Sequence, residues 1–118
     1  MKSYYYAIDG DDVGKSLEQY VLEHNIPAIK ILSTNVKESL LNIEEFLFSQ
    51  GAKTIFCAGD SILAYSPTII NIPNEILFYK NISFSAGIGD SPSLALLALK
   101  KAKGLGKKRI ELFIGSPK

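Results

Sequence analysis

The sequence predicts an α/β fold of the α+β type, with helices on one face of a mostly antiparallel sheet. Two observations predict it. Short apolar runs alternate with segments whose apolar residues recur at helical spacing, and only Gly59-Asp60-Ser61 separates two of those runs, as in a hairpin. The predicted order is β-α-α-β-β-α-β-α-β. The 118 residues match the usual size of one domain, so residues 1–118 are expected to form a single domain.

The first half of the chain predicts one strand, two helices and the hairpin. Tyr4–Ile8 is an aromatic and apolar run that stops at a turn, as a buried strand does. Residues 28–32 fit a loop or a short extended piece equally well. Helical spacing runs from Val13 to Val21, breaks at Asn25–Pro27, and resumes from Thr34 or Asn35 to Gly51. The hairpin strands are Thr54–Ala58 and Ile62–Tyr65.

The second half alternates helices and strands. Asn71 and Pro73 mark a helix start, with Glu75–Lys80 as the helix body. Ile82–Ile88 is an apolar strand. Ser91-Pro92 opens a helix that runs to Lys103, because serine is a good N-cap and proline suits the first helical position. The last strand is Ile110–Ile114.

Composition and charge narrow the function classes. The net charge of +1 argues against a general nucleic-acid coat, which needs a broad basic face, and we expect no sequence-specific nucleic-acid partner. Six basic residues nevertheless gather between Lys100 and Arg109, a pattern that suggests a small anionic ligand. The longest apolar run, Leu94–Leu99, is too short to span a membrane, and the N-terminus lacks a signal-peptide core. With the lone Cys57, these features predict a cytoplasmic protein without direct membrane contact.

Asp9 and Asp60 are the first candidate site. If the third strand lies between the first two, the hairpin turn shares a sheet edge with the end of Tyr4–Ile8, and the two aspartates become neighbours. Adjacent carboxylates repel unless a positive charge lies between them, and Mg²⁺ fits such a pair. The carbonyl of Gly10 is a further possible ligand. The alternative for each aspartate is a simple helix-cap or turn role.

Phosphate groups have a second set of candidate partners around the first turn. The N–H groups of Asp11, Asp12 and Val13 begin a helix, where anions bind well. Gly10 and Gly14 would let the turn approach a ligand closely. The predicted nucleotide and phosphate contacts are Asp11, Asp12, Val13, Gly14, Gly59, Ser61, Lys103 and Lys107. The basic segment has the alternative of a solvated helix end that suits the helix dipole.

Four motifs in order resemble the polymerase and cyclase palm superfamily. They are Tyr-Ala-Ile-Asp9-Gly-Asp-Asp-Val-Gly, Ala58-Gly59-Asp60-Ser61, Phe84-Ser-Ala-Gly-Ile-Gly89 and Leu99-Lys-Lys-Ala-Lys103-Gly104. The chain is most similar to the minimal CRISPR polymerase (mCpol) family, whose palm is related to the type III CRISPR polymerase subunit and to GGDEF diguanylate cyclases. The resemblance implies a ferredoxin-like palm.

The resemblance also implies roles for individual residues. Asp9 and Asp60 match the catalytic, metal-binding aspartates, and Gly10 supplies a carbonyl to the metal. Lys103 matches a lysine that contacts the triphosphate. Ser61 replaces the second acid of the Gly-Gly-Asp-Asp or Gly-Gly-Asp-Glu-Phe hairpin, which removes a ligand or a base. Mg²⁺ or Mn²⁺ is the implied cofactor, as two ions.

The implied activity is nucleotidyl transfer between nucleoside triphosphates, with ATP favoured and pyrophosphate released. The product would be a cyclic oligonucleotide second messenger in antiphage defence, read by a downstream effector. A palm of this size has one site, so the resemblance implies a homodimer with opposed sites. The alternative is an inactive palm acting as a nucleotide sensor or structural subunit. A dehalogenase-type phosphatase is disfavoured, because Asp12-Val13 replaces its Gly-Thr sequence and the hairpin does not fit its fold.

Overall fold

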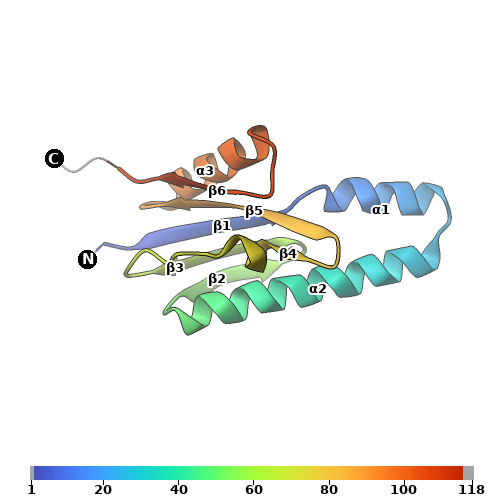
Figure 1. The fold of residues 1–118 in the computed structure, drawn as a ribbon, viewed down its shortest axis with the longest axis horizontal. Coiled ribbons are helices and arrows are strands. Elements are labelled where there is room, and N and C mark those ends of the chain that lie inside the picture. The colour runs from blue at the N-terminus through green and yellow to red at the C-terminus, as the bar shows by residue number, and fades with distance from the viewer. Residues whose placement is uncertain (1, 116–118) are drawn as a thin grey trace.

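The computed structural model describes residues 2–115. It contains a six-stranded sheet, three α-helices and one short 3₁₀ helix (Figure 1). The strands are β1 (Tyr4–Gly10), β2 (Lys53–Ala58), β3 (Ser61–Ser66), β4 (Phe78–Tyr79), β5 (Ile82–Gly89) and β6 (Ile110–Phe113). The helices are α1 (Val13–Leu22), α2 (Ile26–Ser49), η1 (Asn74–Leu77) and α3 (Pro92–Gly104).

The strand order of the sheet is β2-β3-β1-β5-β4, and β6 pairs in parallel with the second half of β5. β3 lies between β2 and β1 and runs antiparallel to both, so β1 and β2 are parallel, as predicted. The register pairs Asp9 with Ser61. The turn of the β2–β3 hairpin therefore lies at the carboxyl end of β1, which places the two candidate aspartates at one edge.

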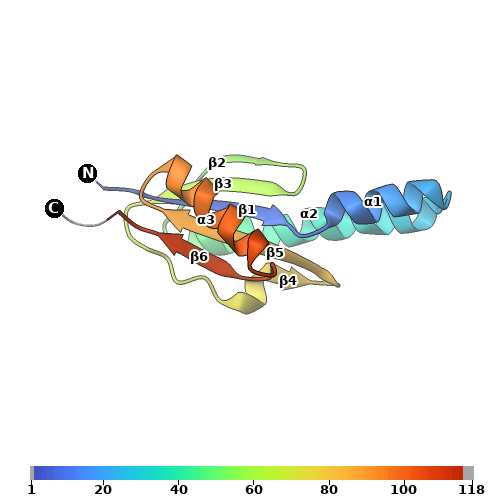
Figure 2. The same ribbon diagram turned by 90° about the horizontal axis from the view of Figure 1, so that it is seen from above.

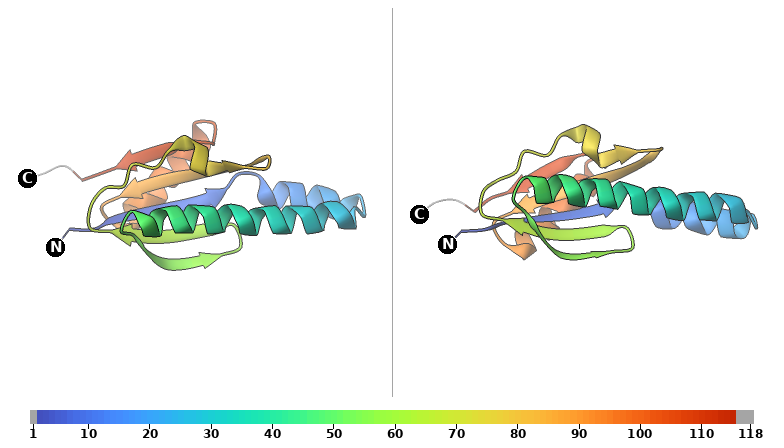
Figure 3. Two further views of the ribbon diagram at one scale, coloured as in Figure 1. Left: turned by 60° about the horizontal axis from the view of Figure 1, so that its bottom comes forward. Right: turned by 90° about the horizontal axis from the view of Figure 1, so that it is seen from below.

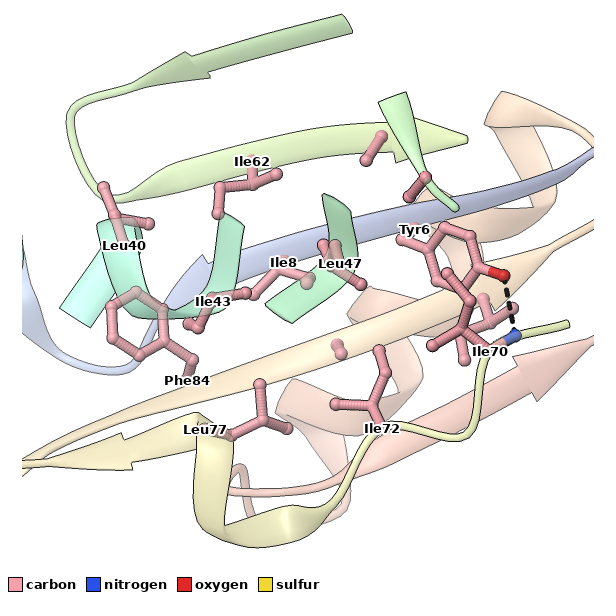
Figure 4. Close-up of a cluster of buried hydrophobic side chains, with 14 of the residues drawn as sticks. Tyr6, Ile8, Leu40, Ile43, Leu47, Ile62, Ile70, Ile72, Leu77 and Phe84 are labelled. Carbon is pink, nitrogen blue, oxygen red and sulfur yellow. Dashed lines mark hydrogen bonds between the residues drawn. The ribbon is translucent and has the colours of Figure 1, made fainter. Parts of the chain in front are cut away.

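The main core lies between the sheet and α2. Ile43 and Leu47 of α2 are buried against Ile8 of β1, Ile62 of β3 and Phe84 of β5 (Figure 4). Successive residues of a strand point to opposite faces, so the even-numbered residues of β1 and β5 form this core. The apolar residues that recur at helical spacing in the second predicted helix form the buried face of α2.

α3 covers the opposite face of the sheet, so the prediction that all helices share one face is wrong (Figure 2). Gly87 and Gly89 of β5 explain this placement. A Cβ added to Gly87 would lie 2.2 Å from the backbone oxygen of Ala95, which shows how closely α3 packs on the strand. All of β5 is buried because it is enclosed from both sides, whereas the sequence pattern alone does not assign a face to α3.

Two elements differ from their predicted bounds. α2 begins at Ile26, and residues 28–32 are helical, because the Asn25 side chain caps the Ala28 amide and Pro27 fits the first turn. The predicted helix Glu75–Lys80 is replaced by η1 and β4. Lys80 and Asn81 adopt positive φ angles and turn the chain back, so that β4 pairs with β5 instead of continuing a helix.

α1 and the first part of α2 project beyond the sheet as a helical hairpin (Figure 3). The molecule is 55 Å long and 28 Å and 21 Å across, and this hairpin accounts for its elongation. No residue of α1 is buried. Among the described residues, no helix combines the length and the apolar character needed to cross a membrane.

Candidate functional site

The structure places the carboxylates of Asp9 and Asp60 on either side of one hydroxyl group. Ser61 Oγ donates to Asp9 Oδ1 at 2.5 Å and lies 3.5 Å from Asp60 Oδ1. The backbone ties the same corner together, because the Gly10 N–H donates to the Asp60 carbonyl at 3.0 Å. Ser61, which replaces the second acid of the hairpin motif, thus bridges the two carboxylates.

The surroundings of Asp60 disfavour its negative charge. Desolvation raises the pKa of Asp60, and the neighbouring charge of Asp9 raises it further. The Lys103 ammonium and the Ser61 hydroxyl act in the opposite direction but do not cancel these two effects. The folded protein therefore holds Asp60 in a position where its negative charge is incompletely compensated, as expected of a group that binds a cation.

Gly10 is required by the tight geometry of this corner. A Cβ at this position would lie 2.7 Å from Val13 Cγ2 and 2.9 Å from Asp60 Oδ2. Its carbonyl faces the charged cluster, since it accepts a hydrogen bond from Lys103 Nζ at 2.7 Å. The absence of a side chain lets Asp60 approach the end of β1, which is the steric reason for glycine here.

Lys103 extends from the last turn of α3 into this cluster. Its Nζ lies 2.8 Å from Asp11 Oδ1 and 3.3 Å from Asp9 Oδ2. It also donates to the carbonyl of Gly10 at 2.7 Å, and the carbonyl of Asp9 lies 3.4 Å away. The lysine side chain is 24% exposed and is therefore partly accessible to solvent. The predicted lysine is therefore beside both carboxylates of the β1 end.

Asp11 lies inside the fold, and its side chain is only 4% exposed. Its carboxylate accepts hydrogen bonds from Ser83 Oγ, Ser85 Oγ, Lys103 Nζ and the Lys108 backbone N–H. Burial alone would raise the pKa of Asp11, but the hydrogen bonds from Lys103 and the two serines outweigh it and lower that pKa. Asp11 is thus an ionised, fully bonded group.

The predicted phosphate contacts around the first turn have different fates. The Asp11 N–H donates to the Ser83 carbonyl at 2.8 Å, so this amide is engaged within the fold, and its contact with phosphate stays a prediction. Asp12 is the N-cap of α1 with a positive φ, and its carboxylate pairs with Lys107. Val13 and Gly14 lie in the first turn of α1 beside Asp60. Their contact with phosphate stays a prediction.

A groove of about 880 Å³ adjoins Asp60 on the α2 side of the sheet. It lies between α1, α2 and the β2–β3 turn. Its lining is largely apolar, with four polar or charged side chains: Ser33, Lys37, Glu44 and Asp60. Small-molecule sites in proteins are typically of this size and character. A second hollow of about 690 Å³, on the α3 side, is lined in part by Asp9, Ser61 and Lys103.

Sequence analysis did not identify Ser83 and Ser85 as partners of Asp11. They occupy alternate positions of β5 and so face the same side as Asp9, with which Ser85 is paired in register. Within α2, the Ser39 hydroxyl donates to the backbone carbonyl of Asn35 at 2.7 Å. The spacing of the two serines predicts that they share one face of a strand. That both bond to Asp11 is evident only from the folded chain.

The sequence matches the family model of the minimal CRISPR polymerase domain, mCpol, over residues 5–113. The chain belongs to the mCpol family. No curated protein sequence is similar enough to count as a match. The match includes every residue of the cluster described above, and the chain is therefore a palm domain of the polymerase and cyclase type.

Solved structures with a similar fold include two diguanylate cyclases and a GGDEF domain. The active GGEEF domain of a diguanylate cyclase from Vibrio cholerae has a TM-score of 0.67 and 16% identity, over 98% of this chain and 85% of that one. SiaD of Pseudomonas aeruginosa, solved with its activator SiaC, has a TM-score of 0.55 and 13% identity, over 94% and 50%. The GGDEF domain of TpbB (YfiN) from the same organism has a TM-score of 0.51 and 14% identity, over 94% and 76%.

The donor set at this corner suits a hard divalent cation. It offers the carboxylates of Asp9 and Asp60 and the carbonyl of Gly10, all oxygen ligands. Residues 2–115 contain no cluster of three or more acidic, histidine or cysteine side chains arranged to hold a metal. A cation with only two carboxylate ligands needs further oxygens from water or phosphate, as Mg²⁺ sites in phosphate-handling enzymes commonly have.

Proposed function

We propose that this mCpol chain is a metal-dependent nucleotidyltransferase that joins nucleoside triphosphates into a cyclic oligonucleotide. The observation that carries the proposal is the pairing of Asp9 and Asp60 through Ser61, beside the Gly10 carbonyl and Lys103. The fold shared with diguanylate cyclase domains supports it. ATP is the favoured substrate, and Mg²⁺ or Mn²⁺ is the cofactor, as two ions.

The chemistry transfers a nucleotidyl group. A ribose hydroxyl gives its proton to water, and its oxygen bonds to the α-phosphorus of a second nucleoside triphosphate. The bond between that phosphorus and the pyrophosphate oxygen breaks, and pyrophosphate leaves. Divalent cations, when bound, would stabilise the attacking and leaving oxygens. The groove beside Asp60 has room for a nucleoside. Lys103, once turned away from the carboxylates, has the charge and reach to contact the triphosphate.

The proposed assembly is a homodimer. Ring closure requires two nucleotides whose hydroxyl and α-phosphate groups face each other, and one chain carries one pair of candidate carboxylates. Two copies with opposed sites satisfy this requirement. The proposed biological role is antiphage signalling, in which a downstream effector binds the cyclic product. The name of the family, a CRISPR polymerase domain, supports this role.

The second candidate is a nucleotide sensor that does not turn over its ligand. Ser61 favours it, because a hydroxyl stands where the hairpin motif has a second acid. The two candidates differ in one measurable property. An enzyme converts the triphosphate and releases pyrophosphate, whereas a sensor binds the triphosphate and returns it unchanged.

The test is incubation of the purified protein with each nucleoside triphosphate and Mg²⁺ or Mn²⁺, followed by mass spectrometry of the products. We expect a cyclic product from the wild type and at least a hundredfold less from Asp60→Asn, the scale on which loss of one electrostatic group slows a reaction. Asp90→Asn is the control, since Asp90 lies at the opposite end of β5 and should retain turnover. If the triphosphate binds but stays intact, the protein is the nucleotide sensor described above. If Asp60→Asn retains turnover, the assignment of Asp60 to the active site is wrong.

A further inference from the structure

Lys103 occupies oxygens that the proposed cation also needs. Its ammonium lies within hydrogen-bond distance of the Gly10 carbonyl, at 2.7 Å, and 3.3 Å from Asp9 Oδ2. These two groups belong to the donor set assigned above to a divalent ion. An ammonium in that position and a metal on the same oxygens exclude each other, because like charges at such a separation repel and each oxygen has limited capacity.

Asp11 holds the lysine there. Its Oδ1 accepts from Lys103 Nζ at 2.8 Å and from Ser85 Oγ at 2.7 Å, while Ser83 Oγ and the Lys108 N–H bond Oδ2. Four donors on a side chain that is 4% exposed leave the carboxylate little freedom to move. Asp11 is thus a rigid anchor beside the cation ligands, contributed from the same loop but not itself facing solvent.

We propose that Lys103, anchored by Asp11, is a built-in competitor of the divalent cation: it holds the cation ligands in the nucleotide-free protein and must leave the Gly10 carbonyl before the metal binds. Asp11 is a positioning residue in this scheme, since it acts through Lys103. The displaced ammonium remains tethered near the site and is free to meet phosphate oxygens. Metal entry and lysine release are therefore coupled. The inference rests on the proposed function, because it takes Asp9, Gly10 and Asp60 as the cation ligands.

The first test measures Mn²⁺ binding by electron paramagnetic resonance of the free ion, without nucleotide. Lys103→Met should bind Mn²⁺ at least about fivefold more tightly than the wild type, a change that one charged hydrogen bond is large enough to supply. Lys101→Met is the matched control. It removes the same charge from a lysine of the same helix that pairs with Glu111 at 3.6 Å, so its affinity should stay within about twofold of wild type.

The outcomes separate this inference from the proposed function. Equal Mn²⁺ affinity for the wild type and Lys103→Met, with weaker binding by Asp60→Asn, would overturn the competition but keep the metal site. An equal gain in Lys101→Met would also overturn it, because the gain would then come from the change in net charge. Absence of Mn²⁺ binding in every variant would refute both. Only a gain specific to Lys103→Met supports the inference.

A second measurement uses the wild-type fold and needs no activity. Ammonium groups held in hydrogen bonds exchange slowly enough to be seen in ¹H–¹⁵N spectra tuned to lysine side chains. We expect a signal from the Lys103 ammonium in the metal-free protein, assigned by its absence in Lys103→Met and weakened by Asp11→Asn. Saturating Mg²⁺ should shift or remove it. If the Gly10 amide responds to Mg²⁺ while the ammonium signal is unchanged, the proposed displacement does not occur.

Discussion

At the scale of single residues, one cluster contains two carboxylates, Asp60 and Asp11, whose pKa values are shifted in opposite directions. Asp11 is bonded by four donors and its pKa is lowered. Desolvation and the nearby charge of Asp9 raise the pKa of Asp60, and its contact with Ser61 is weak. The first carboxylate stabilises the fold, whereas the second is retained at a cost in stability, as functional groups often are.

This difference predicts opposite effects of two isosteric substitutions. The pKa of Asp60 is raised on folding. Its favourable contribution to the free energy of unfolding is therefore present below its ordinary pKa and is lost as pH rises through its pKa in the folded protein. At pH 7, Asp60→Asn should therefore raise the metal-free Tm by roughly 2–5 °C, and the gain should shrink as pH falls toward 4. Thermal unfolding in the presence of a chelator, at both pH values, measures this.

The matched variant is Asp11→Asn. The pKa of Asp11 is lowered on folding, so its contribution is present above the ordinary value and is lost as pH falls through the folded one. At pH 7 this substitution should lower Tm by several degrees, since it removes the charge that Lys103 and both serines bond. A lower Tm for Asp60→Asn, or an unchanged Tm for Asp11→Asn, would contradict the conclusion that the Asp11 carboxylate stabilises the fold and the Asp60 carboxylate destabilises it.

At the scale of elements, the contact between α3 and β5 positions Lys103. The backbone of α3 lies directly on Gly87 and Gly89, and Ala95, Ala98 and Ala102 are fully buried. Small residues on both sides let the helix approach the strand closely. The close packing fixes the height of the last helical turn above the sheet, and with it the distance from Lys103 to the end of β1.

Gly87→Ala should therefore destabilise the protein strongly. The new Cβ would lie 2.2 Å from the Ala95 oxygen and from the Leu99 nitrogen, which are backbone atoms that cannot move without shifting the helix. We expect a loss of about 3 kcal/mol or more in the free energy of unfolding, measured by urea denaturation. Gly104→Ala is the control, because no atom lies within 4 Å of its added Cβ and alanine favours a helix, so stability should be equal or higher.

At the scale of the whole molecule, one end is a packed sheet enclosed by two helices and the other is the projecting hairpin of α1 and α2 (Figure 3). α1 packs against α2 and buries no residue. The groove beside Asp60 lies where these two parts meet, and Leu17 of α1 lines it while remaining 42% exposed. One wall of the groove thus comes from the least enclosed helix.

This arrangement predicts how hydrogen exchange is distributed. Elements with few buried contacts open at lower free energy than the core, so the amides of α1 should exchange much faster than those of β5. Addition of a nucleoside triphosphate with Mg²⁺ should slow exchange in α1 and in the β2–β3 turn. Exchange followed by mass spectrometry measures both effects. Protection of α1 equal to that of β5 in the free protein would contradict this account.

The sequence by itself determined the sheet edge at which Asp9 and Asp60 meet. A buried strand, a helical connection and a tight hairpin are local patterns, and the rules of strand connection then bring the end of β1 and the hairpin turn together. The same local patterns did not distinguish an α-helix from the short 3₁₀ helix and strand at 74–79. There the structure is decided by the pairing of β4 with β5.

Only the tertiary structure decided which face α3 covers, how deeply Asp11 is buried and where Lys103 lies. Lys103 is 94 positions from Asp9 and 92 from Asp11, and no periodicity links residues so far apart. Their meeting depends on the close contact of α3 with Gly87 and on Ser83 and Ser85 lining the same side of β5. Local sequence thus sets each element and its polar ends, whereas packing between elements decides which charges share a site.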